Sequence, residues 1–243
     1  MDEMRTLVCL WDGKQPVSLS NLASQHFLDK SSRKRELDIL KYAFIPRFIK
    51  STPPFAWKIV RALEDKNLPV EILRPVYYWI TVRNEPILYD FVCEKLLIIS
   101  RSGTQFLIKD EVVRWIQNKL SEQKVVWSSS VIQEIAGRIL SVLRDFGILQ
   151  GKVKKRIAPF YLPIETFSYI AFCLKKEGTS ASKLIQHPDW KLFLLTPEII
   201  ERMFLEADRQ KMLRFLAAGK VVRIDFPAQT YEEMANVISR RTT

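Results

Sequence analysis

The residues of this sequence best suited to bind a ligand are clustered basic side chains. Two clusters supply the candidates, which are Lys152, Lys154, Lys155, Arg156, Arg33, Lys34 and Arg35. Ammonium and guanidinium groups bind phosphate oxygens through charge-assisted hydrogen bonds. The run at 30–35 opens a predicted helix, where positive charge opposes the helix dipole. Either a phosphate or acidic partner offsets this conflict, or the run is a solvated surface turn whose charge is screened by salt.

Carboxylates could bind a catalytic metal or act as acids and bases, but their spacing in this sequence does not favour either role. Asp110, Glu122 and Lys124 resemble a metal-nuclease pattern, which needs its carboxylates a few ångströms apart around the metal. A helix predicted over 110–121 would separate the two carboxylates by roughly 18 Å. Asp90 and Glu94 are four residues apart, as in ordinary pairing on a helix surface. We therefore expect no catalytic residue and no enzymatic activity.

Glycine, histidine and cysteine are too few for familiar cofactor or metal sites. None of the seven glycines forms a loop motif that cradles nucleotide phosphates. His26 and His187 are the only histidines, which excludes a zinc finger. Cys9, Cys93 and Cys173 are widely separated, so no disulfide framework is predicted. The sequence thus predicts no metal, no cofactor and a reducing, cytoplasmic location.

The formal charge of the chain is strongly positive. With 38 basic and 27 acidic side chains in 243 residues, the net charge is +11. Such an excess favours a polyanionic partner, either nucleic acid or an acidic membrane or protein surface. Residues 101–176 have a net charge of +7, against +3 for 1–100 and +1 for 177–243. We expect the polyanion to contact the middle of the chain, and no segment is apolar enough to span a membrane.

Apolar residues repeat with the helical period through most of the chain, which predicts a mainly α fold with a few short strands. The strongest helix covers Ser130–Phe146, and Gly147 follows it as a typical C-terminal cap. We expect this helix to begin with a capping box formed by Ser130 and Gln133. Asp110 is the predicted N-cap of the preceding helix.

A loop at 100–103 indicates the first boundary, and the segment with the predicted hairpin ends at proline 163, which gives three regions. They are an N-terminal helical region at 1–103, a basic unit at 104–163 and a C-terminal helical region at 164–243. A short hairpin is predicted at 148–157, with its turn at glycine 151. In the last region we expect a long helix over 197–217 and a strand at 221–226.

The order helix, turn, helix, hairpin within 110–162 is that of a winged helix-turn-helix. In that motif the second helix enters the major groove of DNA and the wing lies along the backbone. Gln133, Arg138 and Arg144 on the polar face of the second helix could then contact bases or phosphates. The alternative is that the motif makes only protein contacts and that the basic hairpin is a solvated surface.

Four stretches of the sequence resemble one known family. They are 54–63, 83–92 with the run Arg83-Asn84-Glu85-Pro86, 127–149 and the tail at 217–234. Together they resemble the BrxA family, a small component of BREX (bacteriophage exclusion) phage-defence systems, over roughly residues 50–238. The resemblance implies a non-enzymatic protein that binds double-stranded DNA beside the methyltransferase and other BREX components. It also implies a NusB-like helical part with winged-helix-like elements, whereas residues 1–16 do not resemble the family.

The first hypothesis is therefore a DNA-binding accessory protein that contacts mainly phosphates. The alternative is a protein–protein scaffold within the defence complex that does not bind DNA directly. RNA binding is a third hypothesis, which rests only on the analogy with the NusB fold.

Overall fold

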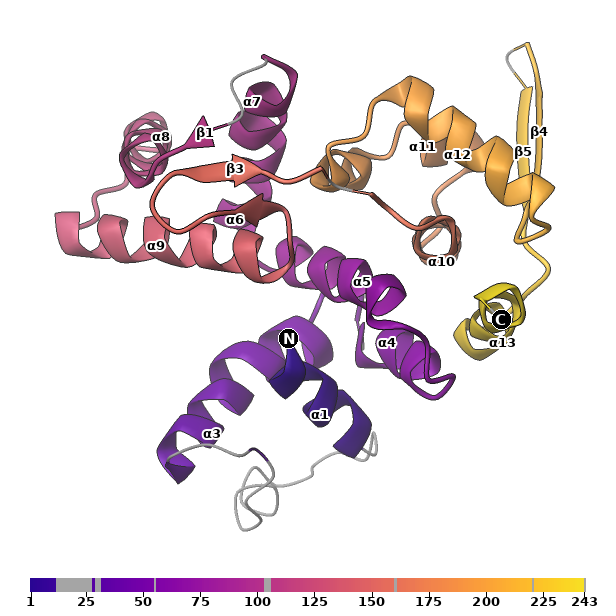
Figure 1. The fold of residues 1–243 in the computed structure, drawn as a ribbon, viewed down its shortest axis with the longest axis horizontal. Coiled ribbons are helices and arrows are strands. Elements are labelled where there is room, and N and C mark those ends of the chain that lie inside the picture. Colours follow the sequence, from indigo (N-terminus) through magenta and orange to yellow (C-terminus); the bar gives the residue numbers. More distant parts are fainter. Residues whose placement is uncertain are drawn as a thin grey trace. The chain divides into compact units, whose positions relative to one another are not determined.

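The computed structural model of the protein describes residues 1–11, 28, 32–54, 56–102, 106–159, 161–219 and 221–242. This part of the chain is mainly helical with a few short strands, which confirms the predicted fold class (Figure 1). The chain divides into two compact units. Unit 1 comprises Met1–Asn84, Pro163–His187 and Pro197–Thr243, and unit 2 comprises Glu85–Leu162 and Pro188–Thr196. The three-region division stays a prediction, because such units do not show which segments fold on their own.

Unit 1 is a helical assembly with a two-stranded antiparallel sheet. Its elements are α1 (Asp2–Leu10), α3 (Arg33–Ile39), the π-helix η1 (Leu40–Ile49), α4 (Ala56–Glu64), α5 (Val70–Arg83), α10 (Ile164–Lys176), α11 (Ala181–Ile185), α12 (Pro197–Arg209), β4 (Arg214–Ala218), β5 (Val221–Asp225) and α13 (Tyr231–Thr242). Helix α10 packs on α5, α12 and α13, and it is almost wholly buried from Ile164 to Leu174. The buried hydroxyls of Tyr169 and Thr166 donate to the carbonyls of Ile59 and Ile72, at 2.7 and 2.8 Å. These bonds satisfy the polar atoms that burial removes from water.

A buried carboxylate joins α1 to the helices of unit 1. The guanidinium of Arg5 donates to both oxygens of Glu64, at 2.7 and 2.8 Å, and the hydroxyl of Tyr77 donates to the same carboxylate at 2.9 Å. Because Glu64 is 8% exposed, the two donors offset the cost of burying its charge. The N-terminal helix is therefore attached by a specific polar contact as well as by apolar packing.

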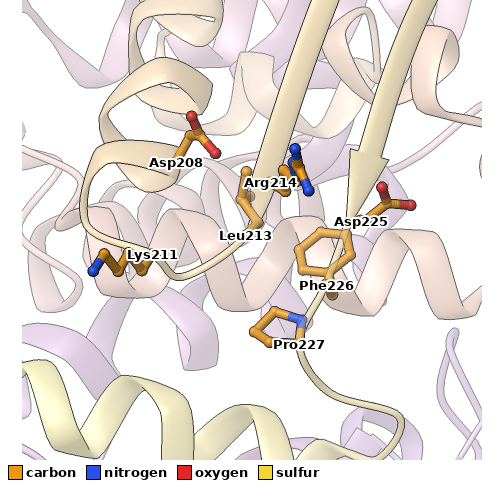
Figure 2. A pocket seen from close by; sticks show the side chains of 7 residues that line it. All are labelled: Asp208, Lys211, Leu213, Arg214, Asp225, Phe226 and Pro227. Atoms are coloured by element: carbon orange, nitrogen blue, oxygen red, sulfur yellow. The ribbon is translucent and has the colours of Figure 1, made fainter.

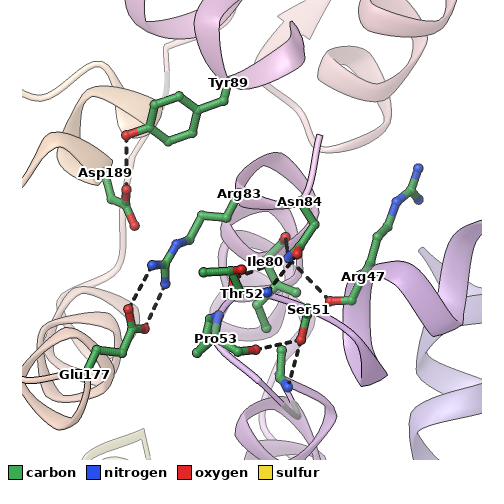
Figure 3. A network of polar contacts seen from close by, with 11 residues as sticks. Arg47, Ser51, Thr52, Pro53, Ile80, Arg83, Asn84, Tyr89, Glu177 and Asp189 are labelled. Carbon is green, nitrogen blue, oxygen red and sulfur yellow. Dashed lines mark hydrogen bonds and ion pairs between the residues drawn. The ribbon is translucent and has the colours of Figure 1, made fainter. Parts of the chain in front are cut away.

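The end of α5 orders the segment that precedes α4 (Figure 3). The side chain of Asn84 accepts a hydrogen bond from the amide of Thr52 and donates one to the carbonyl of Ile80, both at 2.8 Å. Next to it in sequence, Arg83 donates through both terminal nitrogens to Glu177, at 2.8 Å each. The first residues of the stretch 83–92 are thus attached to the segment directly before the stretch 54–63 and to the end of α10.

Unit 2 combines helices with a three-stranded antiparallel sheet. Its elements are α6 (Pro86–Asp90), the π-helix η2 (Phe91–Leu96), α7 (Leu97–Arg101), β1 (Phe106–Leu107), α8 (Lys109–Glu122), α9 (Ser129–Asp145), β2 (Leu149–Gln150), β3 (Lys155–Ile157) and the 3-10 helix η3 (Pro188–Phe193). The strand order is β1-β3-β2, so β3 lies in the centre (Figure 1). Helix α8 packs on α9, and α9 packs on β2. The predicted hairpin at 148–157 is thereby confirmed.

Both predicted helix starts in unit 2 are wrong. Helix α8 begins one residue before Asp110, and the carboxylate of Glu111 accepts the amide hydrogen of Ile108 at 3.0 Å. Helix α9 is capped by Ser128, whose hydroxyl accepts from the amide of Val131 at 3.4 Å. Ser130 is therefore inside the helix and forms no capping box. Positions 128, 129 and 130 are all serine, so the sequence alone offers three equivalent N-caps for this helix.

The predicted long helix over 197–217 is also wrong at its end. Helix α12 ends at Arg209, and Lys211 adopts a left-handed backbone conformation with φ of 58°. The following residues form β4, which pairs with the correctly predicted strand β5 from Arg214↔Asp225 to Ala218↔Val221. This pairing overrides the local helix preference of the sequence. No helix among the described residues is long and apolar enough to cross a membrane.

Candidate functional site

Unit 2 brings several predicted basic residues together around one hollow of about 340 Å³, here called the basic hollow. It is lined by Lys109, Gly137, Leu140, Ser141, Arg144, Lys152, Val153 and Lys155. Three of these, Arg144, Lys152 and Lys155, are sequence-predicted site residues. Lys109, the first residue of α8, was missed, because it is far in sequence from the other residues that line the hollow.

The shape of the hollow follows from α9 and from the turn of the hairpin. Gly137, Ser141 and Arg144 are four and three residues apart, so they share one face of α9. A Cβ atom at Gly137 would lie 3.9 Å from Cε of Lys109, which is ordinary contact. In the hairpin, Gly151 has φ of 101°, and a Cβ atom there would lie 2.5 Å from the carbonyl oxygen of Lys154. Glycine is thus required at the predicted turn, and it fixes where the following lysines lie.

The four predicted cations of the hairpin differ in their exposure and in the hollow that they line. Lys155 is buried at 8% exposure, and its ammonium donates to the carbonyl of Lys152 at 2.7 Å. Lys154 and Arg156 are exposed, and Arg156 lines a separate hollow of about 300 Å³ with Ser100. Because successive strand residues point to opposite faces, Lys155 and Arg156 cannot bind the same phosphate. The sequence could not show this division without the register of β3.

The remaining predicted residues lie away from the basic hollow. On α9, Arg138 is exposed and forms an ion pair with Glu134, four residues earlier, at 2.5 Å. Gln133 on the same helix is half-buried. Two acidic side chains, Glu134 and Asp145, are exposed on this helix, so its surface is less basic than the sequence prediction assumed.

The second predicted basic run lies in the first turn of α3, in unit 1. Arg33, Lys34 and Arg35 are all exposed, and the hydroxyl of Ser32 caps the helix by accepting from the amide of Arg35 at 3.3 Å. Residues 30 and 31 of this run lie outside the described part of the chain. The run belongs to unit 1, whereas the hairpin belongs to unit 2.

The positive charge is spread over both units. Unit 2 contains 13 basic and 9 acidic side chains, a net charge of +4, whereas unit 1 has 25 and 18, a net charge of +7. The acidic residues Asp90 and Glu94 lie in unit 2, where both contact the ammonium of Lys119. Within unit 2, the hairpin at 150–158 is the segment with four cations and no acidic residue.

A hollow of about 390 Å³ in unit 1 has a different character (Figure 2). It is lined by Asp208, Lys211, Leu213, Arg214, Asp225, Phe226 and Pro227. Two acidic and two basic side chains balance its charge, and the carboxylate of Asp208 accepts from the amide of Phe215 at 3.2 Å. Such a lining does not favour a polyanion.

The cysteine thiols stay protonated at neutral pH. Burial raises the pKa of Cys93 to about 11, and it also raises the pKa of Cys9 and Cys173. A raised pKa lowers the fraction of the reactive thiolate at neutral pH. Among the described residues, no three His, Cys, Asp or Glu side chains are grouped as metal ligands.

The model of the BrxA family matches residues 1–173 of the chain. The match starts at the first residue, so the expectation that 1–16 lies outside the resemblance is wrong. It ends before the tail at 217–234, so the resemblance of that tail to the family stays a prediction. No curated protein and no solved structure matches the chain.

Proposed function

Since the chain belongs to the BrxA family of BREX phage-defence systems, we propose that within such a system it binds double-stranded DNA and catalyses no reaction. The observation that carries this proposal is the placement of the basic hairpin beside α9. Helix α8, a turn, helix α9 and the β2–β3 hairpin follow one another in the order of a winged helix-turn-helix. The winged-helix assignment of this unit, and a NusB-like assignment of the helical part, belong to the same proposal.

In this proposal the contacts are mainly to phosphates. Lys152, Lys154 and Arg156 are exposed on the hairpin, and Arg144 is exposed near the end of α9. The pairing of Arg138 with Glu134 leaves α9 few free cations for reading bases. Binding dominated by phosphates is weakly dependent on sequence and falls steeply with salt, because each neutralised phosphate releases counterions.

The test is fluorescence anisotropy of a labelled duplex at several salt concentrations. The variant Lys154→Glu/Arg156→Glu reverses two exposed charges and leaves the buried Lys155 in place. Its matched control, Lys183→Glu/Arg202→Glu, makes the same change of charge at exposed positions of unit 1. We expect the hairpin variant to lose affinity and to lower the slope of log K against log salt by about 1.8, at about 0.9 per phosphate contact.

Three results would change this proposal. Equal binding by the hairpin variant and the wild type would remove the hairpin from the interface. Equal losses in the hairpin and control variants would show a nonspecific effect of net charge. An unlabelled RNA duplex that competes better than DNA of the same sequence would favour the RNA hypothesis.

A scaffold function is the second candidate, and the turn between α8 and α9 supports it. The side chains of Val125 and Val126 in this turn, and of Val131 in the first turn of α9, are 42%, 94% and 40% exposed. Exposed apolar patches are typical of protein contacts. The partners would be other BREX components, including the methyltransferase. A wild-type protein with no duplex affinity at physiological salt, which co-purifies with such a component until Val126→Asp is introduced, would support this function over DNA binding.

A further inference from the structure

The basic hollow of unit 2 has the composition of an anion site. Four cationic side chains line it, and no acidic residue of the described chain does. They come from three elements, since Lys109 begins α8, Arg144 is on α9, and Lys152 and Lys155 belong to the hairpin. Like charges gathered around a small volume repel one another unless an anion lies between them. The concentration of charge here therefore indicates a ligand rather than a contribution to stability.

The low exposure of Lys155, at 8%, is the second observation. An ammonium has three N–H donors, and among the described residues the one acceptor for Lys155 is the carbonyl of Lys152, at 2.7 Å. Burying a charged group with unused donors is costly. A flat surface cannot reach a side chain that is 8% exposed, whereas a small oxyanion that enters the hollow can.

The remaining polar groups of the hollow suit an oxyanion with several acceptor oxygens. Within the described part of the chain, the Arg144 side chain makes long hydrogen bonds, at 3.4 Å to the hydroxyl of Ser141 and at 3.3 Å to the carboxylate of Asp145. Its other donors and the hydroxyl of Ser141 are compatible with a bound group. Gly137 contributes no side chain, so the surface of α9 stays open at this point.

We propose that the basic hollow binds one phosphate group through Lys109, Arg144, Lys152 and Lys155. Two sources share this chemistry. The first source is a backbone phosphate of bound DNA, which the hollow would hold at one defined position in the interface. In this form the inference rests on the proposed function. A free phosphorylated small molecule would make it a ligand site that does not require DNA.

The first measurement is calorimetric titration of the full chain with inorganic pyrophosphate. The variant Arg144→Gln/Lys152→Gln removes two charges from the hollow. Its matched control, Lys154→Gln/Arg156→Gln, removes two charges from the same hairpin but from side chains that do not line the hollow. We expect at least a tenfold loss of pyrophosphate affinity in the hollow variant and less than a twofold loss in the control. Equal losses in the two variants would overturn the inference.

A third variant covers the possibility that the double substitution disturbs the fold. Gly137→Glu adds a carboxylate beside Lys109 without removing any donor, and glutamate is favoured over glycine in a helix. We expect it to abolish pyrophosphate binding, with a circular dichroism spectrum like that of the wild type. Unchanged pyrophosphate binding by a folded Gly137→Glu variant would contradict the proposal.

Duplex binding by the same proteins distinguishes the two sources. If DNA supplies the phosphate, pyrophosphate competes with the duplex and the hollow variant, which loses one phosphate contact, lowers the salt slope by about 0.9. If a small molecule supplies it, the hollow variant loses pyrophosphate and keeps duplex binding. A wild type that binds pyrophosphate in the hollow but binds no duplex would contradict the proposed function alone. Duplex binding that responds only to Lys154→Gln/Arg156→Gln, without pyrophosphate binding, would overturn this inference alone.

Discussion

Two glycines of unit 2 are subject to different physical constraints, which substitution by alanine would reveal. Gly137 is inside α9, where a Cβ atom would make only an ordinary contact with Lys109. Gly147 follows α9 with φ of 79°. We expect Gly137→Ala to raise the free energy of unfolding by about 0.5–1 kcal/mol. Gly147→Ala should lower it by about 1 kcal/mol, because a side chain is strained at positive φ. Urea denaturation measures both, and a loss of stability in Gly137→Ala would contradict the contact geometry.

At the level of single residues, the sequence predicted that the candidate site contains basic side chains. It did not predict which of them are buried or which line the same hollow. Arg144, Lys152 and Lys155 line one hollow, as clustered cations should if they share a ligand. That Lys155 is buried and Arg156 is exposed depends on the register of a three-residue strand, which the composition of the hairpin does not encode. Lys109 enters the site through a contact distant in sequence, which no local pattern predicts.

The start of α9 can be tested at the level of the element. Ser128 caps the helix, whereas Ser130 lies within its first turn and contacts the hydroxyl of Ser128 at 3.0 Å. We expect Ser128→Ala to lower the free energy of unfolding by about 1 kcal/mol, as loss of an N-cap does. Ser130→Ala should change it by less than about 0.5 kcal/mol, as is usual at exposed positions. Thermal or urea denaturation of both variants decides the matter, and the reverse order of losses would restore the capping box predicted at Ser130.

Helices with a strong apolar period were predictable from the sequence. Strand β4 was not, because its conformation depends on pairing with another segment. Helix α9 was predicted to within one residue at each end because its apolar residues repeat with the helical period. Residues 214–217 also look helical when taken alone, yet they pair with β5 along its whole length. Strand pairing is decided by a partner elsewhere in the chain, so local propensity cannot settle it. The same reasoning explains why the short strand β1 was not predicted.

For the molecule as a whole, buried acids predict a loss of stability at alkaline pH. Burial raises the pKa of Tyr77, Tyr169 and Cys173, and the charge of Glu64 raises that of Tyr77 further. In the folded state these groups keep their protons, whereas unfolded tyrosine and cysteine lose theirs near pH 10 and pH 8.5. Above those values the unfolded state binds fewer protons than the folded state, so the free energy of unfolding falls as pH rises.

Tyr77→Phe tests this expectation between about pH 9.5 and pH 11. Although the variant loses the hydrogen bond to Glu64 and starts from a lower stability, its alkaline slope should be shallower. The difference should approach 1.4 kcal/mol per pH unit, the contribution of one proton. Urea denaturation across the range gives the slope, and parallel curves for variant and wild type would show that Tyr77 ionises equally in both states.

The discontinuous course of unit 1 has a consequence for synthesis on the ribosome. Helix α4 packs against α13, so its partner, Tyr231–Thr242, emerges long after α4 itself. At about 5–20 residues per second, that interval is on the order of ten seconds. During it, the apolar face of α4 lacks part of its cover, while Glu85–Leu162 of unit 2 has already been made. Nascent chains should therefore expose this face of α4 until α13 has been made. Helix α13 lies beyond residues 1–173, which the family model matches.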